Sequence, residues 1–545
     1  WTTHPDGTGT AHFYGNYTRN PCNILEARAI PGSRKVVATA GAHHWYTSGS
    51  LIVIDPSVGE DGPEPITRVT PEAAFPETEG WPDRAFVTPW PITEDVFLCA
   101  YSEQWQAKAN SFAIYLVDTL GGRELIYRDP NMSCFSPTPI RTQDMPPALS
   151  SALPEAAAGK TGRVFIRNVY DSTEPIPAGD VTDLRIVRVF PQPVQRVPDR
   201  SQVLFEVSKG IVGTVPVSAD GSVAFTAPAD VPLLFQLLDK DGMAIMGMRT
   251  FVYLHEGEQM TCSGCHENRR AAPPTGASMP QAFLAPRPPS GPSEALGLSF
   301  ARTVQPVLDR HCIRCHGLAA EKNSISLLGT IPQEGITLGQ VKGSEAYLNL
   351  TRRPGCVVAA LRNQESAYST PGDYGSRAGD LAPLLLHGNK DHPPLPDADF
   401  RRVAAWMDLN APFYGGYSWN KAEWRQADPA GEAVFRRAIE RRFGDGLAHQ
   451  PFAALINVAC PEESRILKAP LAVQAGGWGQ ITEGGWETTS DPSYLEIRQR
   501  LQEAIAPLPS EGPDGTCGQT PCQCNACWVP AAEEAYRDGL RAKAK

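Results

Sequence analysis

The sequence predicts a multidomain fold with a β-rich N-terminal half, followed by a mainly α-helical region. A chain of 545 residues is too long for one hydrophobic core. Short β-branched and aromatic runs come first, and helical periodicity begins only after them. We expect five parts in chain order: a partial β-propeller (1–145), a β-sandwich-like middle domain (161–270), a linker (271–298), a mainly α domain (299–415) and a mixed helical, Cys-rich tail (416–545).

The first part contains short apolar runs at 35–39, 51–55 and 95–101, separated by turn residues such as Pro56 and Ser57. Strands and turns at this density are typical of one or two blades of a β-propeller. Because a whole propeller needs more chain, we expect either missing blades or a sheet that closes differently.

The middle domain contains strand-length runs at 164–170, 184–190 and 233–238. Asp220-Gly221 and Asp241-Gly242 have the composition of hairpin turns. These signals predict a small β-sandwich.

Residues 271–298 are rich in Pro, Gly, Ser and Ala, which predicts a flexible or extended linker. Amphipathic helices are expected at 300–311 and 397–409, where apolar residues recur on one face. The tail is predicted to hold helices near 429–443 and 493–506.

Two Cys-x-x-Cys-His runs carry the clearest chemical signal. They are Cys262-Ser-Gly-Cys265-His266 and Cys312-Ile-Arg-Cys315-His316. The spacing is the attachment signature of c-type haem, in which two thiols add to the vinyl groups and the histidine becomes an axial ligand. A zinc knuckle or a pair of disulfides is the alternative for each run. We therefore predict two covalent haem c groups, and a cytochrome c domain at 299–415.

For the second haem, His316 is the expected proximal ligand. His392, just before the helix at 397–409, is the first choice for the sixth ligand, and His387 is its rival. Met407 is a further alternative, although its helical spacing is typical of a core residue. An iron with two histidines is saturated and passes electrons without binding substrate.

For the first haem, His266 is the expected proximal ligand. His255 reaches the opposite face only if the chain folds back. Without a sixth ligand the iron has an open site for a small molecule, which makes this haem the catalytic candidate. Arg269 and Arg270 either hold a propionate or an anionic substrate, or are a solvated pair of charges.

Composition excludes several functions. The net charge is −11, with no basic stripe, so we expect no nucleic acid partner. No run of 18 apolar residues is present, so we expect no membrane span. Covalent haem attachment predicts a periplasmic or otherwise exported protein, and the start at Trp1 without Met suggests a processed or partial chain.

The tail cysteines form a separate group. Cys517, Cys522, Cys524 and Cys527 are followed by Trp528 rather than histidine, so they do not form a third haem motif of the usual form. Two disulfides are the favoured interpretation and a structural metal is the alternative.

Several stretches resemble the hydrazine synthase alpha subunit family. The middle-domain stretches are the most specific, and the resemblance covers most of the chain. The stretches are 43–44 with 49–55, 213–217, 220–222, 235–239, 262–267, 406–412 and 460–470.

The resemblance implies an N-terminal propeller, a middle domain with one haem and a later domain with an electron-relaying haem. In the family, a tyrosine after the first motif ligates iron, and the motif histidine turns to a zinc held by propeller Cys and His residues. Here residues 267–270 contain no tyrosine. Cys22, His43 and His44 remain, together with His266, as possible zinc ligands; alternatively Cys22 is a buried thiol or disulfide partner and the histidines line a domain interface.

These observations predict an exported dihaem c-type cytochrome. It is either an oxidoreductase, or a subunit of one, that acts on a small nitrogenous molecule at the first haem and relays electrons through the second. The alternatives are a pure electron-transfer cytochrome and a docking subunit of a larger redox complex. The expected partners are a redox protein or other subunits of a complex.

Overall fold

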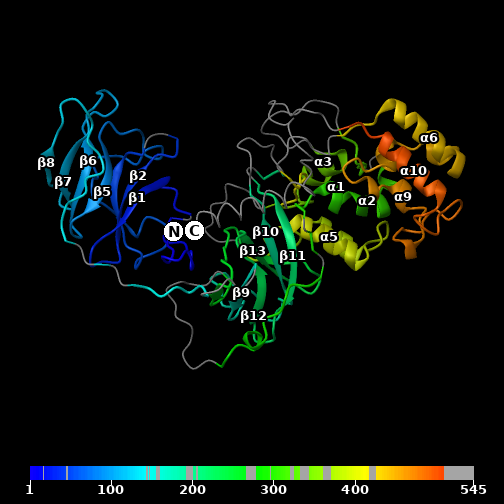
Figure 1. Ribbon diagram of the computed structural model, residues 1–545, viewed down its shortest axis with the longest axis horizontal. Helices are drawn as coiled ribbons and strands as arrows, with labels where there is room; N and C mark the ends of the chain where they lie inside the picture. The colour runs from blue at the N-terminus through cyan, green and yellow to red at the C-terminus, as the bar shows by residue number, and fades with distance from the viewer. Residues whose placement is uncertain are drawn as a thin grey trace. The chain divides into compact units, whose positions relative to one another are not determined.

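The computed structural model describes two compact units, one formed by Trp1–Ala152 and the other beginning at Leu153 (Figure 1). The described residues are 1–15, 17–44, 47–142, 145, 148–154, 160–191, 201–203, 206–265, 278–291, 293–294, 296–318, 325–331, 343–359, 370–416 and 425–507.

The first unit consists of two four-stranded antiparallel sheets, in which neighbouring strands follow one another along the chain. The strands are β1 (Asn23–Ala29), β2 (Val36–Gly41), β3 (Ser50–Ile54), β4 (Ile66–Arg68), β5 (Ala85–Pro91), β6 (Val96–Ser102), β7 (Ala113–Asp118) and β8 (Arg123–Tyr127). Val37 and Leu51 of the first sheet pack with Phe86 and Phe97 of the second in one core. The described strands form no closed barrel.

The second unit begins with a β-sandwich. Its two sheets have the strand orders β11-β10-β13-β14 and β12-β9-β15. The strands are β9 (Thr161–Ile166), β10 (Asp183–Val189), β11 (Lys209–Pro216), β12 (Val223–Pro228), β13 (Leu233–Leu238), β14 (Ala244–Gly247) and β15 (Gln259–Cys262). Val164 and Phe225 from one sheet and Ile186 and Leu237 from the other are buried in a shared core.

One of the two predicted hairpins is correct. Asp241-Gly242 joins β13 and β14, which pair antiparallel. Asp220-Gly221 also forms a turn, with Gly221 at φ +80°, but it connects β11 to β12 and these strands lie in different sheets. The hairpin predicted there is wrong, because β11 pairs with β10 and β12 pairs with β9.

The predicted linker is extended where the structure describes it, and it is held against the sandwich. The backbone amides of Thr214 and Ser290 exchange hydrogen bonds of 2.8 and 2.9 Å. The amide of Arg287 donates to the carbonyl of Ala224 at 3.0 Å. A short turn, η1 (Gln281–Leu284), precedes these contacts. This segment therefore extends two sheet edges.

A helical region follows the sandwich. Its elements are α1 (Phe300–Thr303), α2 (Gln305–His311), η2 (Arg314–Leu318), α3 (Glu345–Thr351), α4 (Leu381–His387) and α5 (Asp397–Asp408). The helix predicted at 300–311 is interrupted at Val304, two residues before Pro306. Proline has no amide hydrogen, so it cannot continue the helical hydrogen bonds of the preceding turn. The helix predicted at 397–409 corresponds to α5.

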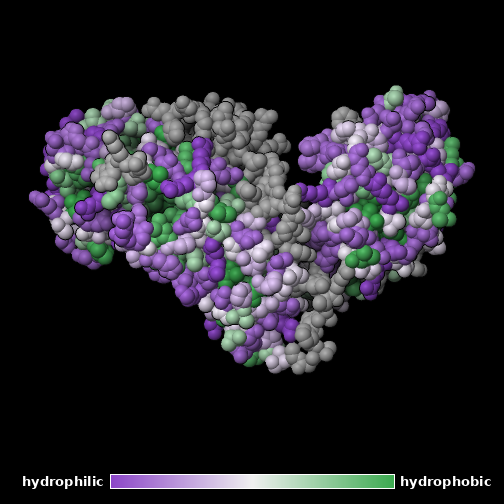
Figure 2. All heavy atoms as spheres, turned by 180° about the vertical axis from the view of Figure 1, so that it is seen from behind, coloured by the Kyte–Doolittle hydropathy of each residue, from purple (hydrophilic) through white to green (hydrophobic). Residues whose placement is uncertain are grey.

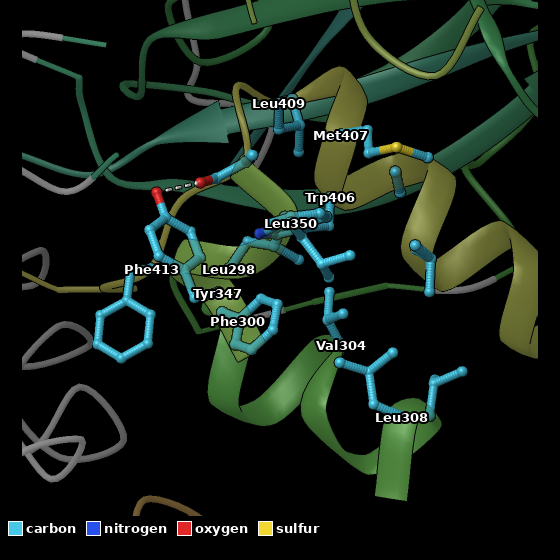
Figure 3. Close-up of a cluster of buried hydrophobic side chains, with 14 of the residues drawn as sticks. Leu298, Phe300, Val304, Leu308, Tyr347, Leu350, Trp406, Met407, Leu409 and Phe413 are labelled. Carbon is cyan, nitrogen blue, oxygen red and sulfur yellow. Dashed lines mark hydrogen bonds between the residues drawn. The ribbon is translucent and has the colours of Figure 1, made fainter. Parts of the chain in front are cut away.

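Four aromatic rings fill the centre of the helical region, as Figure 3 shows. Phe300 lies 5.4 Å, centroid to centroid, from both Tyr347 and Trp406. The hydroxyl of Tyr347 donates to the carbonyl of Ala411 at 3.0 Å, so its polar end is satisfied inside the core. Phe413 completes the group.

The tail forms a separate core around α6 and α10. The elements are α6 (Pro429–Phe443), α7 (Asp445–Ala448), α8 (Phe452–Leu455), η4 (Pro461–Glu463), α9 (Arg465–Lys468), η5 (Val473–Ala475) and α10 (Pro492–Glu503). Phe435, Trp486 and Ile497 are buried there. Both predicted tail helices are present as α6 and α10.

The sandwich and the helical region are joined across a buried seam. Val187 and Leu234 of the sandwich belong to the same apolar core as the helical residues. At its polar centre, Arg185 Nη1 lies 3.0 Å from Asp408 Oδ2, with side-chain exposures of only 5% and 0%. In Figure 1, α5 lies beside the sheet that contains β13.

The face of the molecule in Figure 2 is mostly hydrophilic, with apolar residues in small groups. Among the described helices, none has the length and apolar character needed to cross a bilayer.

Candidate functional site

The clearest constellation is a pair of histidines in the helical region. Nε2 of His316 lies 3.3 Å from Nε2 of His392, although 76 residues separate them. The two rings are nearly parallel, at 19°, with centroids 5.5 Å apart. His316 lies in η2 directly after the second Cys-x-x-Cys run, and His392 lies in the loop between α4 and α5.

The hydrogen bonds of this pair determine where the ring protons are. Nδ1 of His316 lies 3.1 Å from the carbonyl oxygen of Ile325, which can only accept, so this nitrogen carries the hydrogen. Nδ1 of His392 lies 3.2 Å from Oδ1 of Asn389. That atom also accepts from the amides of Asp391 and His392, which identifies it as the amide oxygen.

With both hydrogens on Nδ1, the two neutral rings direct lone pairs at each other from Nε2. Two acceptors in contact repel each other unless a proton or a metal lies between them. Metal–imidazole bonds are about 2 Å long, so an ion between the rings needs a separation of roughly 4 Å, slightly more than the observed one. A second partner on Nδ1 is also the usual way in which metal-binding histidines are oriented. The donor set therefore fits a metal ion bound by two imidazoles, such as a haem iron.

The two cysteines of the second motif directly precede His316 in the chain. Cys312 caps α2 and packs on the helical core, while Cys315 is exposed. Burial raises the pKa of the Cys312 thiol to about 12.

The rival ligands occupy other places. His387 is exposed at the end of α4. Met407 is fully buried in the apolar core (Figure 3). Of the three candidates for the sixth position, the structure brings only His392 to His316.

The first motif begins at the end of β15. Cys262 pairs in parallel register with Ile166 of β9. The amide of Cys265 donates to the carbonyl of Asp171 at 3.1 Å, and a Cβ at Gly264 would overlap that same carbonyl group. Position 264, directly before Cys265, therefore requires glycine. His266, Arg269 and Arg270 lie outside the described residues.

A methionine that the sequence patterns did not single out contacts this motif. Sδ of Met246, on β14, lies 3.8 Å from Sγ of Cys265. Met246 also lines a cavity of ≈ 90 Å³ at the seam, together with Met248, Arg249 and Tyr374. His255 lies elsewhere, with Nδ1 3.7 Å from Asp230. A strand residue such as Met246 has no sequence signal beyond its apolar character.

The first unit contains a second candidate site, at the end of β2. One ligand atom each from His43, His44 and Glu77 fall within 4.8 Å of one another. Cys22 Sγ lies 3.1 Å from Glu77 Oε2, so the carboxylate joins the thiol to the histidine turn. Three of these residues were predicted; His266, the fourth predicted ligand, lies outside the described residues.

Glu77 organises this site. Its carboxylate accepts hydrogen bonds from the backbone amides of His43 and His44 at 3.0 and 2.7 Å. Nδ1 of His44 lies 2.8 Å from Oε1 of Glu77. The hydrogen bond from Cys22 and these amides hold the pKa of Glu77 near 2. Burial, and then the neighbouring carboxylate, raise the pKa of Cys22. The backbone of Glu77 has φ +67°, a conformation that is uncommon outside glycine and often found at functional sites.

The remaining described cysteines, Cys99, Cys134, Cys356 and Cys460, are not in disulfides, and neither is Cys22. The four tail cysteines, Cys517, Cys522, Cys524 and Cys527, lie outside the described residues.

Comparison with known proteins agrees with the predicted resemblance. Residues 179–267 match the family described as hydrazine synthase alpha subunit middle domain. The alpha subunit of hydrazine synthase from Kuenenia stuttgartiensis is 22% identical over 294 residues. The chain is hydrazine synthase alpha-like. This confirms the resemblance that the sequence stretches indicated.

The similarity is partial in length. The alignment covers 44% of this chain and 34% of the curated relative, so about a third of that protein is matched. The solved structure of Kuenenia stuttgartiensis hydrazine synthase superposes with a TM-score of 0.55 at 18% identity, over 72% of this chain and 62% of that one. At this identity the superposition shows a shared fold.

Proposed function

We propose that this hydrazine synthase alpha-like chain is an exported dihaem c-type cytochrome and the redox subunit of an enzyme that acts on a small nitrogenous compound. The observation that carries the proposal is the His316–His392 pair beside Cys312 and Cys315. Two lone pairs that Nδ1 hydrogen bonds hold face to face form a ligand pair for a metal ion. The similarity to hydrazine synthase supports the nitrogenous substrate.

The second site is proposed to relay electrons. Cys312 and Cys315 would hold haem c, and His316 and His392 would ligate its iron; the bound haem would supply a one-electron couple. Asn389 and the carbonyl of Ile325 keep both rings in the ligating tautomer. With both histidines as ligands, this site would bind no substrate.

The first site is proposed to be the reactive one. Cys262 and Cys265 would hold the haem, with His266 as the expected ligand. The carbonyl of Asp171 and the thioether of Met246 position the Cys262–Cys265 turn. The seam cavity beside Met246 has room for a small molecule.

For the first unit we propose a zinc site made by Cys22, His43, His44 and Glu77. Mixed thiolate, imidazole and carboxylate ligands are those that zinc prefers. The carboxylate is already ionised near neutral pH, because its pKa is held near 2. Zinc would replace the thiol proton of Cys22. We also propose that the two four-stranded meanders are propeller blades, which are four-stranded sheets.

Ligand binding separates the enzyme from an electron carrier. We expect carbon monoxide added to the reduced protein to shift the spectrum of one haem of the two and leave the other low-spin. A double variant, Cys262→Ser with Cys265→Ser, is expected to lose the shifting component only. If carbon monoxide shifts neither haem, the protein is an electron carrier and the catalytic proposal fails.

The zinc site has its own test. We expect one zinc per chain by elemental analysis, lost in Glu77→Gln and retained in Glu79→Gln, a neighbouring glutamate that instead pairs with Arg68. Zinc retained in Glu77→Gln would contradict the assignment of Glu77.

A further inference from the structure

The helical region contains a buried carboxyl group with no role in holding the cofactor. Asp309 is 4% exposed and lies in the last turn of α2. Cys312 is three residues further on, so the two side chains lie on the same side of the helix. Burial, and then the nearby Asp309 carboxyl group, raise the pKa of the Cys312 thiol.

The surroundings of Asp309 favour its neutral form. Burial raises the pKa of Asp309 to about 7, against the opposing effects of a hydrogen bond from Gln305 and the charge of Arg465. Nε2 of Gln305 donates to Oδ1 at 2.8 Å. Asp309 forms no ion pair among the described residues. The positive charge of Arg465 on α9 is near enough to lower the pKa of Asp309. This carboxyl group is therefore poised to gain or lose a proton near neutral pH.

Other charged groups around α2 are already paired with one another. Arg310 and His311 lie 3.4 and 2.8 Å from Asp399 of α5. That interaction lowers the pKa of Asp399, which keeps it ionised. On the side of α9, Arg465 Nη1 donates to Gln450 at 2.7 Å. Asp309 is thus a carboxyl group close to Cys312 along α2 that can change between its neutral and ionised forms.

A small cavity lies beside the Gln305 side chain that donates to Asp309. Gln305 is 4% exposed, and its Oε1 has no hydrogen-bond partner. The same side chain lines a small cavity of ≈ 20 Å³ with Ser344 and Asn457, which is room for about one water molecule. A water there would satisfy Oε1 of Gln305 and would lie one side chain away from the Asp309 carboxyl group.

We propose that Asp309 takes up a proton when the haem carried by Cys312 and Cys315 is reduced. One electron from the redox partner or the first haem converts ferric to ferrous iron. One proton from solvent forms an O–H bond on the Asp309 carboxylate, so the net charge of the region is unchanged. In a buried environment of low dielectric, this compensation favours joint uptake of the electron and the proton. The inference rests on the proposed haem at this motif.

The test is a spectroelectrochemical titration of the full-length holoprotein between pH 5 and pH 9. We expect the midpoint potential of the low-spin haem to fall with pH, at a slope approaching 59 mV per pH unit, the one-electron equivalent of a tenfold change. In Asp309→Asn the slope should be lost while haem content and the low-spin spectrum are kept. Asp397→Asn, an exposed carboxylate on α5, is the matched control and should keep the slope.

An infrared measurement on the wild-type protein makes the test independent of any variant. The reduced-minus-oxidised difference spectrum should gain a band of a protonated carboxyl group. A potential that does not vary with pH, or an unchanged slope in Asp309→Asn, would overturn the assignment while leaving the proposed function intact. A protein without covalent haem would overturn both.

Discussion

At the residue scale, the role proposed for His392 depends on the Nε2 lone pair that its ring directs at His316. Its ring is oriented by Asn389, and the loop between α4 and α5 brings it to His316. His387 is only five residues away but is exposed at the end of α4. The distinction between the two histidines therefore depends on the turn after α4, where Gly388 has φ +66° and reverses the chain.

We expect His392→Ala to open the second haem. The low-spin spectrum of that haem should become high-spin, and reduced protein should bind carbon monoxide at both haems instead of one. His387→Ala is the matched control and should leave the spectrum unchanged. If His387→Ala opens the haem and His392→Ala does not, the ligand assignment is reversed.

The buried Asp309 should make stability depend on pH. Its pKa in the folded protein is about 7 against an ordinary 3.8, so the folded state binds more protons between these values. Stability therefore falls as pH rises through this window, by roughly 2–4 kcal/mol in total. Asp309→Asn cannot ionise and should lose less stability from pH 4 to pH 8. Denaturant titrations of the oxidised holoprotein at both pH values check this, and parallel losses would contradict it.

At the element scale, helices were predicted more accurately than the connections between strands. The segments at 397–409, 429–443 and 493–506 carry apolar periodicity over three or more turns, and all three are helices. The turn at Asp220-Gly221 has hairpin composition but crosses between sheets. Local residues specify that the chain turns there, whereas pairing depends on β9 and β10, which are distant in sequence.

The candidate sites also divide into residues with a local sequence signal and residues placed by distant pairing. The two Cys-x-x-Cys-His runs and His392 have recognisable types and positions in the sequence. Glu77 lies 33 residues after His44, and no spacing rule connects them; only the pairing of β2 with β3 and the turn after β4 bring them together. Met246 is likewise placed by the register of β13 and β14.

The turn of the first motif permits a direct test. A Cβ at position 264 would overlap the Asp171 carbonyl group, so Gly264→Ala must displace the turn. We expect a loss of about 1–3 kcal/mol in the free energy of unfolding and incomplete haem attachment at this motif. Gly446→Ala, where a Cβ meets nothing within 4 Å, is the control and should be neutral. Full attachment and unchanged stability in Gly264→Ala would contradict this account of the turn.

At the scale of the whole molecule, the seam packs the sandwich and the helical region around a shared core. The carboxylate of Asp408 accepts hydrogen bonds from Arg185, the amide of Ala244 and the hydroxyl of Ser376, all within 3.1 Å. Gln236 donates to the carbonyl of Asp408 at 2.8 Å. The seam thereby links the sandwich, which carries Cys262 and Cys265, to the helical region, which carries Cys312 and Cys315.

Asp408→Asn should weaken the seam, because it leaves the Arg185 charge buried without its partner. The expected cost is about 3–5 kcal/mol of unfolding free energy. Asp397→Asn removes an exposed partner of Arg401 and should cost no more than about 0.5 kcal/mol. Denaturant unfolding followed by tryptophan fluorescence and haem absorbance measures both variants. Equal free energies of unfolding for the two variants would show that the Arg185–Asp408 pair is not a major contributor to stability.

The intact mass of the denatured, purified protein tests the central claim most directly, because covalent haem stays attached when the chain unfolds. The account predicts a mass above that of the polypeptide by two haem groups. It also predicts loss of one group in Cys312→Ser with Cys315→Ser, and of the other in Cys262→Ser with Cys265→Ser. A protein with the mass of the bare polypeptide, isolated from a host that performs haem attachment, would contradict it.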